Sequence, residues 1–434
     1  MTRPSHDGAL DMIEMVGTAH RPIFGSNWDN SAKCGSRSSN WNNATLNLNS
    51  NIGTRGVTET KGLTLRLAVS TRSKDRIHDG GVSGSVGRPE ARERIFLKRH
   101  GNLWHLVIDP DNIEEAYRKA KQGKTWQQTV QRVEHRKQEI MDRIRASLVD
   151  RSFTTSEYRV KLVHEPKERT IYVLPFAPDR IVQHAVMNVV SPLWDKKFDR
   201  DSHACRPGRG QHSASQRVMQ FSRRYRYALQ GDIRRFYPSI HHDTLIEIIH
   251  QKIKDPDVLW LLEDIIRSFP GGRNVPIGNL TSQWLGNLYM NEFDRYVRTE
   301  IRPGGYVRYN DDFLLFGNDK QALRSAQDDC RAFLDARLKL TLSKDRVYPV
   351  SQGVDFVGYR HFRDYVLIRK RTARRVKQRI RHLRYELATG QIEPERARSV
   401  VASTIGWLQW ANAHNFRRAL GLDGLQEDIC GAIQ

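Results

Sequence analysis

Three aspartates in two parts of the chain have the residue type and surroundings that a metal-dependent reaction requires. Asp311 and Asp312 are adjacent and lie inside the run 306–316, where apolar residues flank them on both sides. Asp232 follows the short apolar run 227–229. Neighbouring like charges repel and favour a cation between them, and carboxylate oxygens are ligands that Mg²⁺ prefers. Together the three aspartates could hold two Mg²⁺ ions for an in-line nucleotidyl transfer.

Strands are expected to position these aspartates. The run 306–316 has high β-propensity on both sides of its two acids, which predicts a hairpin whose turn carries them. The run 227–229 predicts a short strand that ends close to Asp232, with helical spacing beyond it. A solvated acidic turn fits the Asp-Asp pair alone equally well. The second acidic site upstream favours the catalytic interpretation.

Four blocks of sequence carry a resemblance to a known family. Residues 231–237 (Gly-Asp-Ile-Arg-Arg-Phe-Tyr) and 309–312 (Tyr-Asn-Asp-Asp) resemble motifs A and C of reverse transcriptases, the second being that family's Tyr-x-Asp-Asp box. Residues 275–283 (Val-Pro-Ile-Gly-Asn-Leu-Thr-Ser-Gln) and 288–294 lie between them in the family's order. Most reverse transcriptases have Gln where this chain has Ile277, and the block as it stands resembles the diversity-generating retroelement branch.

The resemblance implies an α+β right-hand polymerase with fingers, palm and thumb, a helical N-terminal region and a disordered N-terminal extension. It implies an RNA-directed DNA polymerase, a nucleotidyltransferase that copies a template-repeat RNA into cDNA with errors opposite adenine. That cDNA would replace the variable repeat of a target gene, a process called mutagenic retrohoming. The expected domains are the extension (1–92), the helical region (93–150), the fingers (151–230), the palm (231–360) and the basic helical thumb (361–434).

The resemblance also implies cofactors and partners. These are two Mg²⁺ ions, dNTPs, the element's own RNA and a small basic accessory protein. The implied metal ligands are the catalytic residues Asp232, Asp311 and Asp312, together with Ile233. Asn310 occupies the variable position of the Tyr-x-Asp-Asp box, where this branch more often has an apolar residue. The change leaves the three carboxylates intact.

Six residues match positions that contact the nucleotide in this family. The residues expected there are Lys161, Arg169, Tyr237, Ile277, Gln283 and Lys344. The alternating run 158–176 predicts the fingers hairpin, from which the two basic residues would hold the triphosphate. Tyr237 falls where the family keeps an aromatic gate under the sugar, although core packing of a Phe-Tyr pair is the alternative. An aliphatic Ile277 cannot make the polar contact of the usual Gln, so base discrimination should fall. Lys344 matches the lysine that can protonate the departing pyrophosphate.

A second set of positions matches residues that hold primer and template. The residues expected there are Arg180, Phe356, Gly358, Tyr359, Arg374 and Arg375. Residues 354–360 resemble the primer-grip turn, where a glycine allows close approach of the backbone. Residues 369–384 carry ten basic side chains on a helical pattern, which predicts docking on nucleic acid and steep salt dependence. For Arg180 an ion pair at a helix start explains the residue equally well.

The N-terminal part of the chain differs in composition. Residues 1–92 are rich in Gly, Ser, Asn and Thr, with no sustained apolar period, which is typical of disorder. The Asn-rich segment 25–53 is similar to the variable region of lectin-like target proteins of these retroelements, so it could be the template repeat read as protein. The working polypeptide would then start near Arg92. Residues 113–123 and 126–148 predict two amphipathic helices, for which core packing and RNA or accessory-protein contact are both open.

Composition limits the classes of protein that the chain could belong to. A formal charge of +22 and a pI near 10 favour a polyanionic partner. The four cysteines stand far apart with no C-x-x-C pair, so neither a zinc site nor a disulfide framework is predicted. No run of about 18 apolar residues occurs, and no signal core is found at the N-terminus. We therefore expect a cytoplasmic protein with no membrane contact.

Two alternative functions remain from the sequence. A group II-intron-like or phage-defence reverse transcriptase would share every catalytic residue. A non-catalytic RNA-binding protein with a polymerase fold belongs to another class, and the presence of all three carboxylates argues against it. The errors opposite adenine and a neighbouring repeat would separate the first alternative from the diversity-generating type.

Overall fold

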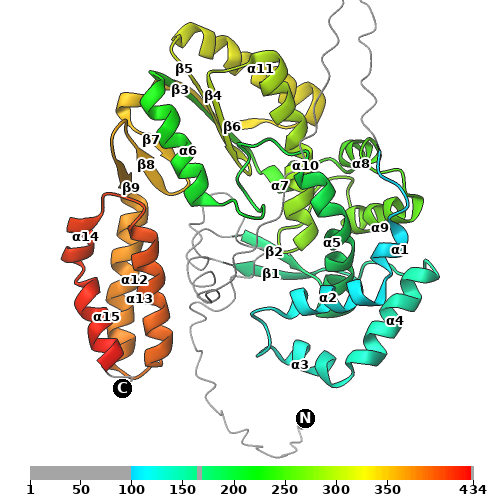
Figure 1. The fold of residues 1–434 in the computed structure, drawn as a ribbon. Helices are drawn as coiled ribbons and strands as arrows, with labels where there is room; N and C mark the ends of the chain where they lie inside the picture. The colour runs from blue at the N-terminus through cyan, green and yellow to red at the C-terminus, as the bar shows by residue number, and fades with distance from the viewer. Residues whose placement is uncertain (1–98, 164–168, 432–434) are drawn as a thin grey trace, which may run out of the picture.

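The computed structural model describes residues 99–163 and 169–431 (Figure 1). The predictions for residues 1–92 lie outside this range. The described chain is a mixture of helices and strands in the arrangement of a right-hand polymerase, with a helical N-terminal region before it.

The N-terminal region is helical. Its helices are α1 (Trp104–Val107), α2 (Pro110–Lys121), α3 (Gln128–His135) and α4 (Lys137–Val149). The prediction of one continuous helix over residues 126–148 is wrong, because the backbone leaves the helical region at Arg136 (φ −124°, ψ 33°). The Arg136 guanidinium pairs instead with Glu139 in the first turn of α4. Buried apolar residues on α2 and α4, Tyr117 and Ile144 among them, pack this region onto the main core.

The fingers contain the predicted hairpin. Strand β1 (Arg159–Val163) pairs antiparallel with β2 (Arg169–Val173), and the turn that joins them lies outside the described residues. The short helix η1 (Phe176–Arg180) and helix α5 (Ile181–Asp195) follow. Asp179, in η1, accepts through its Oδ1 a hydrogen bond from the backbone N–H of Ser156, which ties the start of α5 to the segment before β1.

The palm is built on a four-stranded antiparallel sheet with the strand order β4-β5-β3-β6. Its strands are β3 (Tyr227–Ile233), β4 (Gly305–Tyr309), β5 (Asp312–Gly317) and β6 (Leu342–Pro349). The helices around it are α6 (Gln211–Arg224), α7 (Phe236–Ser239), α8 (His242–His250), α9 (Pro256–Arg267), α10 (Leu280–Tyr296), η2 (Val297–Ile301) and α11 (Lys320–Leu338).

Both faces of the palm sheet are buried. Residues that point to one face, such as Phe313 and Leu315, join the core formed with α10 and α11. Their neighbours Leu314 and Phe316 join a second cluster with α6. Successive side chains of a strand point to opposite faces, so a sheet covered on both sides requires a continuous apolar run. This requirement explains why β5 is apolar throughout after its first residue.

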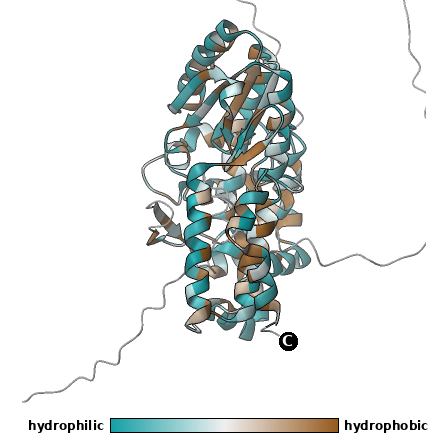
Figure 2. Cartoon of the chain, turned by 90° about the vertical axis from the view of Figure 1, so that its left-hand side faces the viewer, coloured by the Kyte–Doolittle hydropathy of each residue, from teal (hydrophilic) through white to brown (hydrophobic). Residues whose placement is uncertain are grey.

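The thumb is a separate helical unit attached through a small sheet (Figure 1). That sheet contains β7 (Val354–Phe356), β8 (Tyr359–His361) and β9 (Val366–Ile368), preceded by η3 (Val350–Gln352). The thumb helices are α12 (Lys370–Ala388), α13 (Pro394–Leu408), α14 (His414–Ala419) and α15 (Leu422–Gly431). Figure 2, which views this side, shows hydrophilic residues over much of their outward surface.

Two further expectations concern the whole chain. Within residues 99–163 and 169–431, no helix is long and apolar enough to cross a membrane. Cys330 is buried and unpaired and Cys430 is also free.

Candidate active site

Two of the three predicted aspartates face each other across neighbouring strands. Asp232 on β3 is the register partner of Asp312 on β5. Asp311 lies in the turn before β5, and its carbonyl accepts a hydrogen bond of 3.3 Å from the N–H of Ile233. Side chains of register partners project from the same face of a sheet. The sheet therefore gathers the three aspartates at one end of the palm.

The acids lie on a hairpin as predicted, but only Asp311 is in its turn, because Asp312 is already the first residue of β5. Tyr309 of β4 pairs with Asp312 of β5, which leaves Asn310 and Asp311 as a two-residue turn. Asn310 has a left-handed backbone conformation (φ 59°), which asparagine tolerates better than most residues. The presence of Asn at the variable position of the box therefore has a local physical reason.

A fully buried arginine braces this turn from below. Arg308 has no exposed surface, and its guanidinium makes two hydrogen bonds to the carboxylate of Asp294, at 2.6 and 2.7 Å. It also donates to the side chains of Asn287 and Ser202 and, at 2.9 Å, to the carbonyl of Asn310. Burial raises the pKa of Asp294, and the adjacent Arg308 opposes that rise. The guanidinium thus makes five hydrogen bonds, one of which holds the carbonyl of Asn310 in the turn.

A third strand extends the row of charges. Lys344 on β6 is the register partner of Asp232, so the order across the sheet is Asp312, Asp232 and Lys344. The register shifts between Asp232 and Ile233, and this β-bulge lets Ser343 donate a hydrogen bond of 2.5 Å to Oδ2 of Asp232. Sequence reasoning missed Ser343, because no motif marks it and only the bulge brings it to the carboxylate.

The donor set fits Mg²⁺ in kind. Asp232, Asp311 and Asp312 offer hard oxygen ligands from adjoining backbone positions, and Ile233 contributes only its backbone because its side chain is buried in the core. In the described part of the chain, however, no three His, Cys, Asp or Glu side chains are gathered closely enough to hold a metal ion. One carboxylate oxygen of Asp232 instead accepts the hydrogen bond from the hydroxyl of Ser343. The strands thus bring the three aspartates to the same end of the sheet, and their side chains do not form a closed metal site in this arrangement.

Tyr237 lies directly beside the acidic turn. Its hydroxyl donates a hydrogen bond of 3.2 Å to Oδ1 of Asn310, and its ring is packed against that of Phe236. Burial, followed by the nearby charge of Asp311, raises the pKa of Tyr237. Gly286 of α10 gives the two rings room, because a Cβ there would lie 3.1 Å from Phe236 and 3.2 Å from Tyr237.

The loop before α10 joins the fingers to the palm. A Cβ on Gly278 (φ 126°) would lie 2.7 Å from the backbone carbonyl oxygen of Tyr172 on β2, so only glycine fits there. Ile277 is partly buried and packs against the main core. Gln283, expected at a helix start, lies in the first turn of α10 and is 7% exposed. The sequence block 275–283 thus contacts the fingers hairpin.

The predicted basic residues of the fingers lie at different depths. Lys161 is exposed on β1, opposite Ile171 of β2. Arg169 begins β2, but its side chain is outside the described part of the structure. Arg180 ends η1 and is partly buried. In Figure 1, the hairpin lies below the end of the palm sheet at which β3 leads into α7.

The predicted primer-grip aromatics are buried. Phe356 is 1% exposed, and Tyr359 has no exposed surface, so neither ring is available to a primer. Tyr359 stacks on Trp407 of α13 with ring centroids 4.7 Å apart and donates a hydrogen bond to the Trp407 carbonyl. The two rings therefore fasten the thumb to the palm. The turn between Phe356 and Tyr359 contains Gly358 at φ 90°, and its backbone is the part that remains for contact with a primer.

The basic thumb helix has the predicted two faces. Thr372, Val376, Ile380 and Leu383 are its buried residues. Arg374 is exposed and Arg375 is partly buried. Every third or fourth residue of α12 therefore meets the thumb core, and the remaining basic residues cover the outside.

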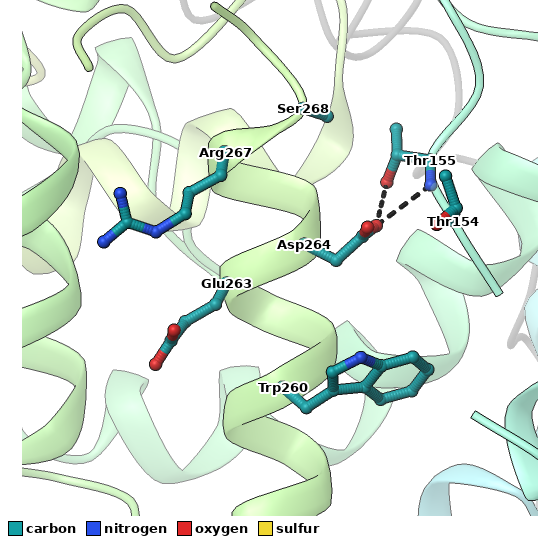
Figure 3. A pocket seen from close by; sticks show the side chains of 7 residues that line it. All are labelled: Thr154, Thr155, Trp260, Glu263, Asp264, Arg267 and Ser268. Carbon is teal, nitrogen blue, oxygen red and sulfur yellow. Dashed lines mark hydrogen bonds between the residues drawn. The ribbon is translucent and has the colours of Figure 1, made fainter. Parts of the chain in front are cut away.

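One hollow is lined by none of the three aspartates of the palm. It has a volume of about 410 Å³ and is lined by Thr154, Thr155, Trp260, Glu263, Asp264, Arg267 and Ser268 (Figure 3). Oδ2 of Asp264 accepts hydrogen bonds from the N–H and the hydroxyl of Thr155, at 2.9 and 2.6 Å. This carboxylate anchors the segment that leads into the fingers hairpin, so the hollow belongs to the support of the site.

The fold is consistent with that of a right-hand polymerase, and the three aspartates lie at one end of its palm sheet. Residues 164–361 match the family model described as "Reverse transcriptase (RNA-dependent DNA polymerase)". The matched range contains β2 of the fingers hairpin, all three aspartates and the turn at Gly358, while β1 lies just before it. This part of the chain is therefore similar to reverse transcriptases.

Several curated proteins are similar to this chain. Protein YkfC of Escherichia coli (strain K12) is 28% identical, over 46% of this chain and 63% of its own length. The group II intron-encoded protein LtrA of Lactococcus lactis subsp. cremoris is 28% identical, over 29% of this chain and 22% of its own length. Nuclear intron maturase 4, mitochondrial, of Arabidopsis thaliana is 22% identical, over 55% of this chain and 29% of its own length. The chain spans less than two thirds of the length of each.

Solved structures with a similar arrangement include two telomerases. Apo telomerase from Candida tropicalis, truncated from its C-terminal domain, is 12% identical with a TM-score of 0.39, over 50% of this chain and 55% of that one. Telomerase from Candida albicans in complex with a fragment of telomeric RNA is 11% identical with a TM-score of 0.39, over 61% and 58% of the two chains.

Proposed function

We propose that this chain is an RNA-directed DNA polymerase of the diversity-generating type, which copies a template-repeat RNA into cDNA with errors opposite adenine. The observation that carries the proposal is Ile277, an aliphatic residue in the loop whose next residue, Gly278, touches the backbone of the fingers hairpin. Errors of this kind would diversify a target gene after the cDNA replaces its variable repeat.

The proposed chemistry uses the acidic end of the palm. Two Mg²⁺ ions, held by Asp232, Asp311, Asp312 and the backbone at Ile233, would supply activation of the primer 3′-hydroxyl and charge neutralisation on the triphosphate. Lys161 and Arg169 on the fingers hairpin would bind the triphosphate, and Lys344 beside Asp232 would give a proton to the departing pyrophosphate.

The remaining parts would hold the polymer. Arg180 and Gln283 would support template and nucleotide, and the turn at Gly358 would approach the primer through its backbone. Arg374 and Arg375 on α12 would contact phosphates from the thumb. Tyr237 would exclude a 2′-hydroxyl by the bulk of its ring.

The loss of base discrimination that Ile277 could cause is limited in size. Loss of one hydrogen bond of about 1 kcal/mol raises misincorporation several-fold and not thousands-fold. Strong selectivity for errors opposite adenine therefore requires contributions from other groups, such as the RNA or a small basic accessory protein. We also propose a cytoplasmic location and a working polypeptide that starts near Arg92.

The proposal is tested by sequencing cDNA. The purified chain, with any accessory protein encoded beside it, is given the element's RNA, dNTPs and Mg²⁺, and a variant with Asp311→Ala and Asp312→Ala serves as the control. The expected product is absent with the control and carries substitutions concentrated opposite adenine. A faithful product would remove the diversification claim and keep the polymerase. The absence of product under every priming condition would favour an RNA-binding role.

An intron-encoded type of reverse transcriptase is the second candidate. The observation in its favour is the similarity to a group II intron-encoded protein and to a nuclear intron maturase. Such an enzyme would share the palm residues and differ in its error spectrum. A phage-defence enzyme would do so as well, and a near-copy of the DNA for residues 25–53 in a neighbouring gene, altered at adenines, would favour the diversity-generating type.

A further inference from the structure

The side-chain amide of Asn310 lies between Tyr237, the expected sugar gate, and Asp311, an expected metal ligand. Its Oδ1 accepts the hydrogen bond of 3.2 Å from the hydroxyl of Tyr237, and its Nδ2 lies 3.4 Å from Oδ1 of Asp311. All three side chains are buried, with exposed fractions between 1% and 6%. One amide group therefore links the ring of Tyr237 to a carboxylate of the acidic turn.

The backbone of Asn310 is fixed independently of this amide. Its left-handed conformation (φ 59°) belongs to the two-residue turn, and its carbonyl accepts a hydrogen bond from the buried Arg308. The amide is therefore presented from a rigid position. A side chain on a rigid turn can hold a mobile neighbour in place, because it does not move with that neighbour.

The ring of Tyr237 is held mainly by packing in the hydrophobic core. Its residue follows Phe236 on the four-residue helix α7, and its carbonyl accepts a hydrogen bond from the N–H of Val275. One edge of the ring faces Gly286, which has no side chain. The hydrogen bond to Asn310 is the polar contact that fixes the far end of the ring.

We propose that Asn310 is a positioning residue that sets the sugar selectivity of the polymerase by holding the hydroxyl end of Tyr237. This proposal rests on the proposed function, in which Tyr237 excludes a 2′-hydroxyl. An apolar residue at position 310 has no acceptor for the tyrosine hydroxyl, so the ring would have only packing to hold it. The exclusion of a single oxygen atom requires a ring held within a fraction of an ångström.

The test compares two variants that each remove one end of the same hydrogen bond. Asn310→Gly deletes the amide and keeps a residue suited to the left-handed conformation, and Tyr237→Phe deletes only the hydroxyl. The quantity measured is the ratio of kcat/KM for a dNTP to that for the matching rNTP during primer extension. Each variant is expected to lower this ratio about five-fold, the effect of one hydrogen bond.

The double variant identifies the shared interaction. If the two residues act through one hydrogen bond, Asn310→Gly combined with Tyr237→Phe lowers the ratio no further than either change alone. Independent effects would multiply to about 25-fold, from two effects of about five-fold each, and would overturn the proposal. Thermal unfolding of all three variants shows whether each is folded at the assay temperature.

A third variant separates the two contacts of the amide. Asn310→Asp keeps an acceptor for Tyr237 but places a carboxylate beside Asp311. The selectivity ratio should remain within two-fold of the unchanged chain, while kcat for the dNTP should fall because neighbouring like charges repel. A ratio that falls as far as with Asn310→Gly would contradict the role of the acceptor.

Failure of the polymerase activity and failure of the role of Asn310 give different results in primer extension. A chain that extends no primer in any condition overturns both the polymerase and the role of Asn310. A chain that extends primers with dNTPs, and whose selectivity is unchanged by Asn310→Gly and by Tyr237→Phe, overturns only the role of Asn310. Selectivity that falls with Tyr237→Phe alone would also overturn it.

Discussion

Arg308 shows how a single residue supports the site without reaching a substrate. It is buried beneath the acidic turn and satisfies the carboxylate of Asp294 and the carbonyl of Asn310 together. A buried ion pair contributes little compared with a well-packed apolar pair, but removal of one partner leaves an uncompensated charge. The importance of Arg308 therefore lies in the order that it imposes on the turn.

The first prediction is for Arg308→Leu. This change should lower the free energy of unfolding by about 3–5 kcal/mol, because Asp294 would remain buried without its partner. Urea unfolding measures the loss. The matched control is Arg324→Leu on the exposed side of α11, which should change stability by less than about 0.5 kcal/mol. Equal effects of the two changes would contradict the bracing role.

The second prediction concerns Ile277. Ile277→Gln restores the polar side chain that most reverse transcriptases have at this position, and it should lower misincorporation several-fold by adding one hydrogen bond of about 1 kcal/mol near the base pair. Sequencing of cDNA from the variant and the unchanged chain provides the comparison. Leu at the same position is the control for packing, and an unaltered error rate in Ile277→Gln would remove this residue from the account of fidelity.

At the scale of elements, two close contacts leave no room for a side chain, one between the fingers hairpin and the loop before α10 and one within the palm sheet. The carbonyl of Tyr172 on β2 lies against Gly278, and the ring of Phe313 on β5 lies against Gly231 on β3. A Cβ at Gly231 would be 2.2 Å from that ring. These two glycines set how closely the hairpin, the loop and the acidic strands can approach one another.

The third prediction is therefore that Gly278→Ala disturbs the fingers more than an ordinary substitution. The new methyl group would strike the carbonyl of Tyr172, and the backbone at φ 126° would be strained. We expect a loss of at least about 1 kcal/mol in stability and a rise in KM for dNTPs. Gly424→Ala, at a glycine with nothing within 4 Å, is the control and should be neutral or slightly stabilising.

The thumb helix α12 supplies the fourth prediction. Arg374, Lys377 and Arg381 project from its exposed side. If each contacts one phosphate of a single strand, their joint replacement by Gln should reduce the slope of log K against log salt by about 2. Filter binding of RNA over a range of salt concentrations measures the slope.

The control for the thumb removes the same charge elsewhere. Arg267 and Arg295 are exposed, Arg337 is partly exposed, and each is paired with an acidic residue on a palm helix. Their replacement by Gln should leave the salt slope nearly unchanged. A similar loss of slope in both triple variants would indicate that only net charge matters.

At the scale of the whole molecule, several neutral histidines link parts of the fold. His361 on β8 is fully buried between Ser215 of α6 and the carbonyl of Val354, and burial lowers its pKa to about 4. Burial also lowers the pKa of His203 to about 4. These histidines bind protons more readily in the unfolded chain than in the folded chain. Their contribution to the free energy of unfolding is therefore fully present above about pH 6.5 and is lost as the pH falls toward 4.

The fifth prediction follows from the lowered pKa values of these histidines. The free energy of unfolding should be lower at pH 5 than at pH 7, and His361 should account for about 2 kcal/mol of the difference. His361→Gln should reduce the difference by about that amount, and the exposed His105→Gln should not alter it. Urea unfolding at the two pH values decides the matter, and an unchanged difference in His361→Gln would show that His361 is not the group responsible.

The sequence by itself determined those features that depend on local pattern. The fingers hairpin, the acidic hairpin and the basic thumb helix follow from alternation, turn residues and helical spacing, and the structure has all three. The order of the motif blocks indicated the polymerase fold and the three aspartates together. Local patterns determine such features because they involve neighbours in the chain.

The tertiary structure decided what depends on contacts between distant residues. The bulge that brings Ser343 to Asp232, the bond between Tyr237 and Asn310, and the burial of Tyr359 against Trp407 join elements far apart in the sequence. Phe356 and Tyr359 were expected at a primer but lie inside the fold. An aromatic residue next to a turn suits either place, and only the packing of the thumb on the palm determines which side of the ring meets protein.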